Sequence, residues 1–491
     1  MQHTRHVAVN MPMILRVTGQ LLLVEAAFML LPLIVCLLRG EHDFQAFAIS
    51  LAMMAGAGAL LGFLVKPRNR VMRRRDGLLL ASVAWVVFSI FGMVPFMLCD
   101  TPLNASEAFF ETMSGFTTTG ATVIRDVEQC SHGVLLWRAL TQWIGGLGII
   151  IFTLTFIPAL NNSGSLIMFH AEATGITHDK LGARIARTAK LLWGLYIIFT
   201  IVLVVLLCLG PMSVFDSVCQ GFTAISTGGF STHNDSIAAF NSPYIKVVLT
   251  TFMFIGGVSF GLIITSIKSR RLVFWANDVF RTYVVMILVF YVAVVAAIVG
   301  RGYFTGWESV TIDPIFHIIS AVTSTGFSEG DWEGWGTIVL TLTFFMMYVG
   351  ACAGSTTGGL KVDRLLFLIK NLKLVVQRYV RPRLMRSVSI NDQIVDSSRA
   401  TDIIAFITIY TILIVIGGVV LVYQGFPIVD AFFSSFSCVS NNGLGAGVTG
   451  ITGSYDFLSS SGKWVMSLLM LAGRLEIMTL LALLMPSFWK H

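Results

Sequence analysis

The chain has 491 residues, of which 55% are hydrophobic and 12% are charged, and its formal net charge is +7 at neutral pH. Soluble proteins carry about 25% charged residues. Several apolar runs here exceed the ~18 residues that a helix needs to cross a bilayer. This composition excludes a soluble enzyme and predicts an all-α integral membrane protein.

Hydropathy predicts the membrane helices in chain order. The apolar run that begins near Met13 and ends near Leu38 is too long for the apolar core of a signal peptide, and no small-residue cleavage site follows it. It is therefore expected to remain as the first helix. The expected helices are 12–38, 46–65, 77–99, 135–160, 190–210, 243–267, 279–300, 336–349 continuing at 360–376, 401–423 and 463–485.

The distribution of charge predicts the orientation of these helices. One set of connecting segments holds 23 Lys and Arg against seven acids, whereas the alternate set holds six against sixteen. Cytoplasmic loops are enriched in Lys and Arg, so the first set and both termini are expected in the cytoplasm. The basic segments are 66–76, 172–190, 268–281 and 361–399. The acid-rich outer face would raise the local concentration of cations.

Four similar short segments recur about every hundred residues, each between two long apolar stretches. Each is preceded by an apolar stretch that can form a half-spanning helix but is too short to cross the bilayer. A half-helix directs its negative C-terminal end toward the membrane centre, which favours a cation there. The segments are Ser114–Gly120, Phe222–Gly228, Ser320–Gly326 and Ser437–Gly443.

Irregular backbone is tolerated at membrane depth only where it lines a cavity, and a final glycine can adopt a positive φ that turns carbonyls toward a common axis. Four loops of this kind around one axis would offer rings of carbonyls to a dehydrated cation. Small-residue helix packing, the alternative, would not produce this spacing. The sequence therefore predicts four pseudo-symmetric helix–pore-loop–helix repeats around one pore, preceded by two N-terminal transmembrane helices.

A second glycine-rich stretch, 350–359, interrupts what would be one continuous helix after the third loop. It lacks the Gly-Lys-Ser/Thr of a phosphate-binding loop. We expect an unwound intramembrane segment beneath the pore loops that acts as a gate, with a passive kink as the alternative. The stretch 56–62 is also rich in glycine, but it lies within an apolar span and is expected to serve close helix packing.

Few charged residues fall inside the predicted spans. Arg474 lies halfway along the last span, where a charge is costly and requires a partner in the bundle interior. Glu476 points to another face of the same helix and is a poor partner for it. We expect Arg474 to bond the 350–359 segment, and Glu25 in the first helix to make an interhelical hydrogen bond.

These motifs resemble those of the Trk/Ktr/HKT superfamily of potassium transporters, with the greatest similarity to its bacterial TrkH/TrkG branch, over almost the whole chain. The motifs that carry the resemblance are 117–122, 226–232, 323–327, 354–361 and 473–476. The resemblance implies that backbone carbonyls of four residues per loop line the potassium sites. These residues are Thr117, Thr118, Thr119, Gly120, Ile225, Ser226, Thr227, Gly228, Thr323, Ser324, Thr325, Gly326, Ser440, Asn441, Asn442 and Gly443.

The resemblance also implies several properties of the whole protein. Glycine rather than serine at Gly120 implies selectivity for potassium over sodium, and the fourth loop departs from the others through its two asparagines. The family implies a multi-pass protein of the bacterial cytoplasmic membrane that forms a homodimer with one pore per protomer. It further implies a cytosolic nucleotide-binding regulatory ring of the TrkA type. The residues assigned to gating are Gly350, Gly354, Ser355, Thr356, Thr357, Gly358, Gly359 and Arg474.

We expect the chain to consist of an N-terminal pair of helices followed by four pore repeats. The boundaries are 1–76, 77–170, 171–270, 271–390 and 391–491. The function expected is potassium uptake, with K⁺ as the transported ion, no enzymatic activity and no nucleic-acid partner. The alternative is a secondary symporter for another cation or a small solute. Such a site needs several polar groups that converge within the spans, and the sequence offers few.

Overall fold

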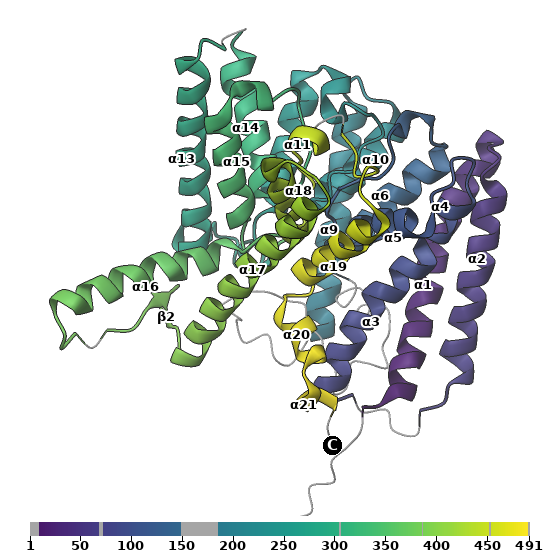
Figure 1. Ribbon diagram of the computed structural model, residues 1–491, viewed down its shortest axis with the longest axis horizontal. Coiled ribbons are helices and arrows are strands. Elements are labelled where there is room, and N and C mark those ends of the chain that lie inside the picture. Colours follow the sequence, from purple (N-terminus) through teal and green to yellow (C-terminus); the bar gives the residue numbers. More distant parts are fainter. Residues whose placement is uncertain are drawn as a thin grey trace, which may run out of the picture.

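The computed structural model describes residues 9–67, 72–148, 185–303, 306–384, 386–450 and 453–489. The described chain is almost entirely helical, and Figure 1 shows most helices running along one common direction, which confirms the predicted all-α class. The helices up to the second repeat are α1 (Met11–Arg39), α2 (Phe44–Ala59), η1 (Leu60–Leu64), α3 (Arg74–Gly92), α4 (Val94–Leu98), α5 (Ala105–Phe116), η2 (Val127–Gln129), α6 (His132–Gly146), α9 (Ile185–Cys208), α10 (Val214–Ile225), η4 (Ser236–Phe240), α11 (Pro243–Gly256) and α12 (Phe260–Ser269).

The third and fourth repeats follow, with a short hairpin between them. Their elements are η5 (Phe274–Ala276), α13 (Asp278–Gly300), α14 (Glu308–Val322), η6 (Glu333–Trp335), α15 (Thr337–Val349), α16 (Val362–Val380), β1 (Ser389–Ile390), β2 (Gln393–Ile394), α17 (Ser397–Tyr423), α18 (Ile428–Ser440), η7 (Gly447–Thr449), α19 (Ser460–Arg474), α20 (Met478–Leu484) and α21 (Pro486–Trp489).

Within the described ranges, six helices are long and apolar enough to cross a membrane, and two bent helix pairs bring the number to eight. The bent pairs correct two sequence predictions. The expected span 243–267 is broken between α11 and α12 by 89°, and the expected span 463–485 is broken between α19 and α20 by 115°. Hydropathy averaged over a whole span did not reveal either break, because each pair of helices is apolar enough together to pass as one span. The second half of the expected span 135–160 and most of the basic segment 172–190 lie outside the described residues.

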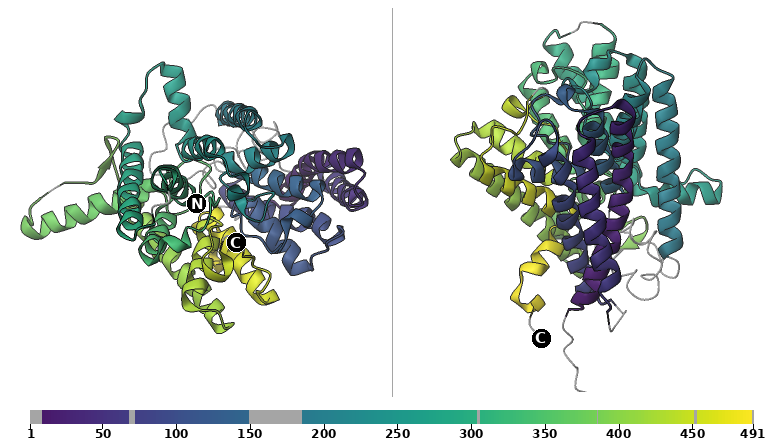
Figure 2. Two further views of the ribbon diagram at one scale, coloured as in Figure 1. Left: turned by 90° about the horizontal axis from the view of Figure 1, so that it is seen from above. Right: turned by 90° about the vertical axis from the view of Figure 1, so that its right-hand side faces the viewer.

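Four short helices, α5, α10, α14 and α18, occupy equivalent places in the four repeats. Each packs against the helices that flank it in its own repeat. Each also packs against a helix of the preceding repeat: α10 on α6, α14 on α11, α18 on α15, and α5 on α19. The last of these contacts joins the fourth repeat to the first. The four short helices therefore surround a common centre, and Figure 2 shows from above how the blue, teal, green and yellow parts of the chain are arranged around it.

The two N-terminal helices pack against the first repeat, α1 against both α3 and α6. Glu41, in the turn between α1 and α2, fastens them by accepting hydrogen bonds from the first two amides of α6, His132 N at 3.0 Å and Gly133 N at 3.1 Å. Burial acts to raise the pKa of Glu41, but these amides and the His132 ring outweigh it, and the pKa is lowered. The carboxylate thus caps the N-terminus of α6.

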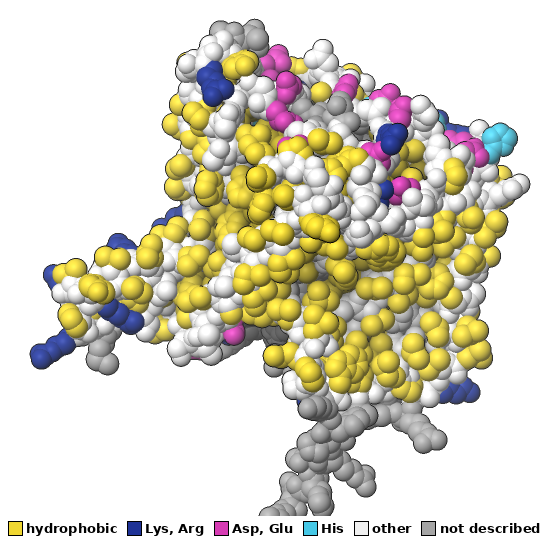
Figure 3. Space-filling model, viewed as in Figure 1, with side chains coloured by type: hydrophobic (Ala, Val, Ile, Leu, Met, Phe, Trp, Pro, Cys, Tyr) yellow, Lys and Arg dark blue, Asp and Glu magenta, His cyan; other side chains and the backbone are white. Residues whose placement is uncertain are grey.

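The surface matches a protein that spans a bilayer. Figure 3 shows hydrophobic side chains covering the middle of the molecule, with Asp and Glu gathered at one end and Lys and Arg on the projecting arm and at the other end. The arm is α16, which leaves the body at the basic end (Figure 1). Its residues Leu372, Tyr379 and Val380 are exposed.

Candidate selectivity filter and the loop beneath it

The four short helices end in the same backbone conformation. In each loop an amide two or three residues past the helix end donates to the carbonyl five residues before it, with N–O distances between 2.8 and 3.0 Å. This bond pattern closes a helix with a left-handed residue, as in the Schellman motif. The left-handed residues are Thr118, Thr227, Ser324 and Asn441, with φ between 52° and 55°. The loops are therefore structural repeats as well as sequence repeats.

The shared conformation corrects the register of the second loop. The bonding amides are those of Thr119, Gly228, Thr325 and Asn442, so Gly228 matches a threonine or asparagine rather than the glycine that ends each of the other loops. The glycine that follows, Gly229, has φ 81°. Its counterparts Gly120, Gly326 and Gly443 have φ values of 84°, 82° and 77°. The second loop is thus Ser226–Gly229 instead of Ile225–Gly228, because the consecutive glycines at 228 and 229 made the register ambiguous.

The four matched glycines form a closed ring with the carbonyls of their neighbours. A Cβ at Gly120 would lie 2.2 Å from the carbonyl oxygen of Gly228. A Cβ at each of the other glycines would lie at most 2.2 Å from a carbonyl of the next loop, and the fourth closes on the first. These pairs are Gly229 with Thr325, Gly326 with Asn442, and Gly443 with Thr119. Only glycine permits backbones to approach so closely at a positive φ.

An outer hollow opens above this ring. The four glycines 120, 229, 326 and 443 all line it, together with residues of the segments that follow each loop. The charged residues in the lining are basic, Arg125 and Arg138, each paired with a carboxylate, Asp456 and Glu111 respectively. The acid-rich outer face expected from the sequence therefore lies around the hollow rather than in its wall.

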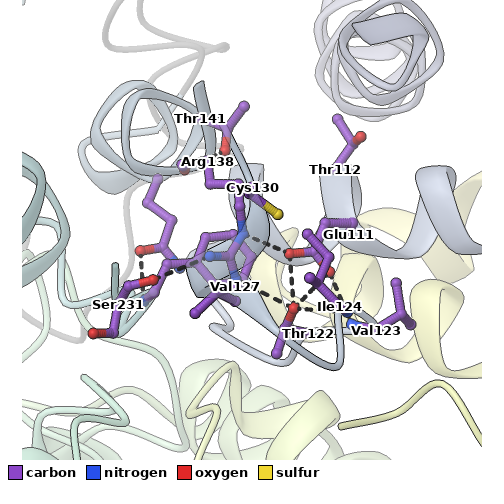
Figure 4. A network of polar contacts seen from close by, with 12 residues as sticks. Glu111, Thr112, Thr122, Val123, Ile124, Val127, Cys130, Arg138, Thr141 and Ser231 are labelled. Atoms are coloured by element: carbon purple, nitrogen blue, oxygen red, sulfur yellow. Dashed lines mark hydrogen bonds and ion pairs between the residues drawn. The ribbon is translucent and has the colours of Figure 1, made fainter. Parts of the chain in front are cut away.

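A buried ion pair fixes the chain beside the hollow. Arg138 Nε donates to Glu111 Oε1 at 2.8 Å, and both side chains are excluded from solvent. Figure 4 shows how the pair reaches two repeats: Arg138 also donates to the Ser231 carbonyl at 3.1 Å, while Glu111 accepts from Thr122 and from the amide of Val123. This network, which the sequence analysis did not anticipate, holds the chain that leaves the first two loops.

The asparagines of the fourth loop hold it to its neighbours. Asn441 Nδ2 donates to Thr119 Oγ1 at 3.0 Å and to the Met470 carbonyl at 2.9 Å. Asn442 Nδ2 donates to the Ala321 carbonyl at 2.7 Å. The departure of this loop from the Thr/Ser pattern thus gives contacts to the first and third repeats.

The glycine-rich segment predicted to be unwound lies irregularly between α15 and α16, beneath the loops. Thr356 Oγ1 contacts the carbonyls of Ile225, at 3.3 Å, and Gly256, at 3.2 Å. Gly358 N donates to Ser324 Oγ at 2.6 Å, and Gly359 N donates to the Ser440 carbonyl at 2.9 Å. The segment therefore contacts the second, third and fourth repeats at the inner ends of their short helices.

Arg474 joins this segment to the first repeat. It lies at the last residue of α19, at the bend, rather than in the middle of a continuous span as expected. Its guanidinium donates to the Thr356 carbonyl at 3.1 Å, and to the carbonyls of Gly145 at 2.7 Å and Gly146 at 2.9 Å. The predicted contact between Arg474 and the glycine-rich segment is therefore present.

Three further charged residues surround the segment. Lys361, which the sequence analysis did not single out although it ends the glycine-rich motif, is buried and donates to Thr357. Glu476 pairs with Arg364 at 2.6 Å, which supports the expectation that it does not serve Arg474.

The interhelical hydrogen bond expected for Glu25 in α1 is wrong within the described chain, where neither of its buried carboxylate oxygens has a hydrogen-bond partner.

Comparison with known proteins agrees with this architecture. The family of cation transport proteins called TrkH matches residues 43–490. The chain belongs to the TrkH family. It is therefore a transporter rather than an enzyme, and a multi-pass protein of the bacterial inner membrane.

Individual relatives of the TrkH family match over nearly their full lengths. The chain is 32% identical to the Trk system potassium uptake protein TrkH of Halomonas elongata, over 98% of this chain and 100% of the relative. It is 30% identical to the protein of the same name from Salmonella typhimurium, over 97% and 99%. The crystal structure of the potassium transporter TrkH from Vibrio parahaemolyticus matches with a TM-score of 0.89 and 29% identity, over 98% of this chain and 100% of that one.

Proposed function

We propose that this member of the TrkH family takes up potassium through a filter of four loops, Thr117–Gly120, Ser226–Gly229, Thr323–Gly326 and Ser440–Gly443. The supporting observation is the closed ring in which each filter glycine lies against a carbonyl of the next loop. Backbone carbonyls can replace the hydration shell of a potassium ion. The relatives that match over their full lengths are named potassium uptake proteins.

In this proposal the 350–359 segment closes the pathway below the filter. It bonds three repeats directly and the first through Arg474. The fixed positive charge of Arg474 adds an electrostatic barrier to a cation. The proposal also includes domain boundaries at 76, 170, 270 and 390. It includes a homodimer with one pore per protomer, and a TrkA-type cytosolic ring that controls the segment.

Replacing the first filter glycine tests the filter directly. Gly120→Ser places a side chain at a φ of 84° and against the Gly228 carbonyl. We expect the ratio of potassium to sodium permeability to fall, by about tenfold if one ring is distorted by roughly 1.4 kcal/mol. Fluxes of potassium, rubidium and sodium are measured in liposomes that contain the purified protein.

Gly194→Ser is the matched control, because a Cβ at Gly194 in α9 would have no atom within 4 Å. This variant should keep the parent's selectivity. A folded Gly120→Ser protein with unchanged selectivity contradicts the filter. Uptake of a small organic solute with no ion selectivity would instead favour a secondary symporter.

A further inference from the structure

The four loops differ in the side chain of the residue that supplies the ring carbonyl. The residues that supply these carbonyls are Thr119, Gly228, Thr325 and Asn442. In three of the loops the residue has its own polar side chain, which bonds within the protein: Thr119 to Thr117, Thr325 to Thr323, and Asn442 to the Ala321 carbonyl. In the second loop the residue is glycine and brings no side chain.

The space that a side chain at Gly228 would fill is taken by a residue of the first repeat. A Cβ at Gly228 would lie 2.4 Å from both Cδ and Oε1 of Gln142, and 2.8 Å from its Nε2. Gln142 is on α6 and is fully buried. Its amide therefore stands where the other loops place threonine or asparagine.

Gln142 also makes the hydrogen bonds that such a side chain could make. Its Nε2 donates to the carbonyl of Gly228 at 2.7 Å, and its Oε1 accepts from the amide of Phe230 at 3.1 Å. In the described part of the chain, the carbonyls of Thr119, Thr325 and Asn442 accept no side-chain hydrogen bond. The two bonds hold the second loop on both sides of Gly229.

The matching positions on other helices carry no amide. One glycine on each of α6, α11 and α19 faces a carbonyl in the last two residues of a short helix: Gly145 faces Phe116, Gly256 faces Ile225 and Gly473 faces Val439. The residues three positions earlier are Gln142, Met253 and Met470. A polar residue thus occurs at this position beside the loop that lacks a side chain, and methionine occurs in the two other repeats that can be matched in this way.

We propose that Gln142 is a positioning residue of the filter, which supplies from the first repeat the side chain that the second loop lacks and so fixes the direction of the Gly228 carbonyl. The inference rests on the proposed function, because it concerns the selectivity of the same ring. Gly228 itself does not require a positive φ. The side chain of Gln142 is therefore what prevents a larger residue there.

The substitution that tests this role is Gln142→Met. It removes both hydrogen bonds, while its volume is similar and methionine is already found at the matching positions 253 and 470. We expect the ratio of potassium to sodium permeability in liposomes to fall about three- to tenfold, as for the loss of one or two buried hydrogen bonds. Met253→Leu, the matched control on α11, should leave the ratio unchanged. A residue that only fills space would tolerate methionine.

A compensating pair of substitutions tests the spatial argument. Gly228→Ser alone should lower selectivity because its side chain collides with Gln142, and Gln142→Ala alone should lower it because the amide is lost. In Gln142→Ala/Gly228→Ser the new side chain has room, and the permeability ratio should exceed that of either single variant. A double variant that is no better than the poorer single variant overturns the inference.

The failure of this inference is distinguishable from failure of the filter. If Gln142→Met keeps the parent's permeability ratio while Gly120→Ser loses it, the filter stands and Gln142 has no positioning role. If both variants keep the ratio, the filter itself is wrong. Monodisperse elution in detergent verifies that each variant is folded before its fluxes are compared.

Discussion

Arg138 and Glu111 form an ion pair whose side chains are 2% and 0% exposed. The guanidinium also lies over the ring of Phe230, 4.2 Å from its centroid, and thus touches the second repeat as well as the first. A buried pair is weak evidence for stability by itself, because the desolvation of two charges offsets their attraction. Removal of only one partner is expected to lower the stability of the protein, since it leaves the other charge buried and uncompensated.

Arg138→Met is therefore expected to destabilise the protein strongly, by about 3–5 kcal/mol, whereas Arg138→Met/Glu111→Leu should cost less than the single substitution. The thermal unfolding midpoint in detergent micelles measures both. Arg125→Gln is the control, because it breaks the pair with Asp456 in which the arginine is 82% exposed, and its effect should be much smaller. An Arg138→Met protein as stable as Arg125→Gln contradicts the argument.

At the scale of elements, the segment between α15 and α16 contacts the four-loop region through backbone atoms and small hydroxyls. Cys352 N donates to the Gly257 carbonyl at 3.0 Å, and Phe260 N donates to the Gly354 carbonyl at 3.0 Å. These bonds also hold the break between α11 and α12 against the segment. Displacement of the segment would release several repeats together, as a gate requires.

Arg474→Ala removes the three hydrogen bonds that tie this segment to the first repeat. Since hydrogen bonds to a charged group contribute about 1.5–3 kcal/mol, the flux without activator should rise about tenfold or more. Deletion of residues within 350–359 should act in the same direction. The combined variant should add little to either change because both act on one barrier. Liposome flux below or equal to that of the parent would remove Arg474 from gating.

Much of this arrangement could be predicted from sequence, for a physical reason. The four loops repeat in residue type because each glycine meets a carbonyl, and Arg474 was conspicuous because a charge in an apolar stretch needs a partner. The breaks after α11 and α19 were not predicted, because each lies within a stretch whose mean hydropathy over a whole span is high, although Arg474 and Glu476 stand at the second break. Gln142 was missed because its partners Gly228 and Phe230 are 86 and 88 residues away in the sequence, and Arg138 because Glu111 lies on a different helix, 27 residues earlier.

At the scale of the whole molecule, the proposed regulatory partner must meet the basic end of the protein. The α16 arm projects there (Figure 1), and the residues that follow it include exposed Arg381 and Arg383. The helix begins directly after Lys361, at the end of the glycine-rich segment. A force applied to the arm is therefore transmitted to that segment through a continuous helix.

Replacing Arg378, Arg381 and Arg383 with glutamine should weaken the binding of a TrkA-type ring, because exposed positive charge is lost, while basal flux in liposomes stays near that of the parent. Co-purification with the ring measures binding. Glutamine at Lys268, Arg270 and Arg271, a basic cluster of the same size at the C-terminal end of α12, is the control and should bind normally. Equal binding by both triple variants places the docking surface elsewhere.

The ring is built from one polypeptide, so its four carbonyls belong to four different residues: Thr119, Gly228, Thr325 and Asn442. In a pore made from four identical subunits, any inherited substitution appears four times at once. Here a single codon change alters one quadrant and leaves three intact. Under the proposed function, ion preference can consequently be adjusted in small heritable steps, each of which can be compensated by a second change in an adjoining repeat.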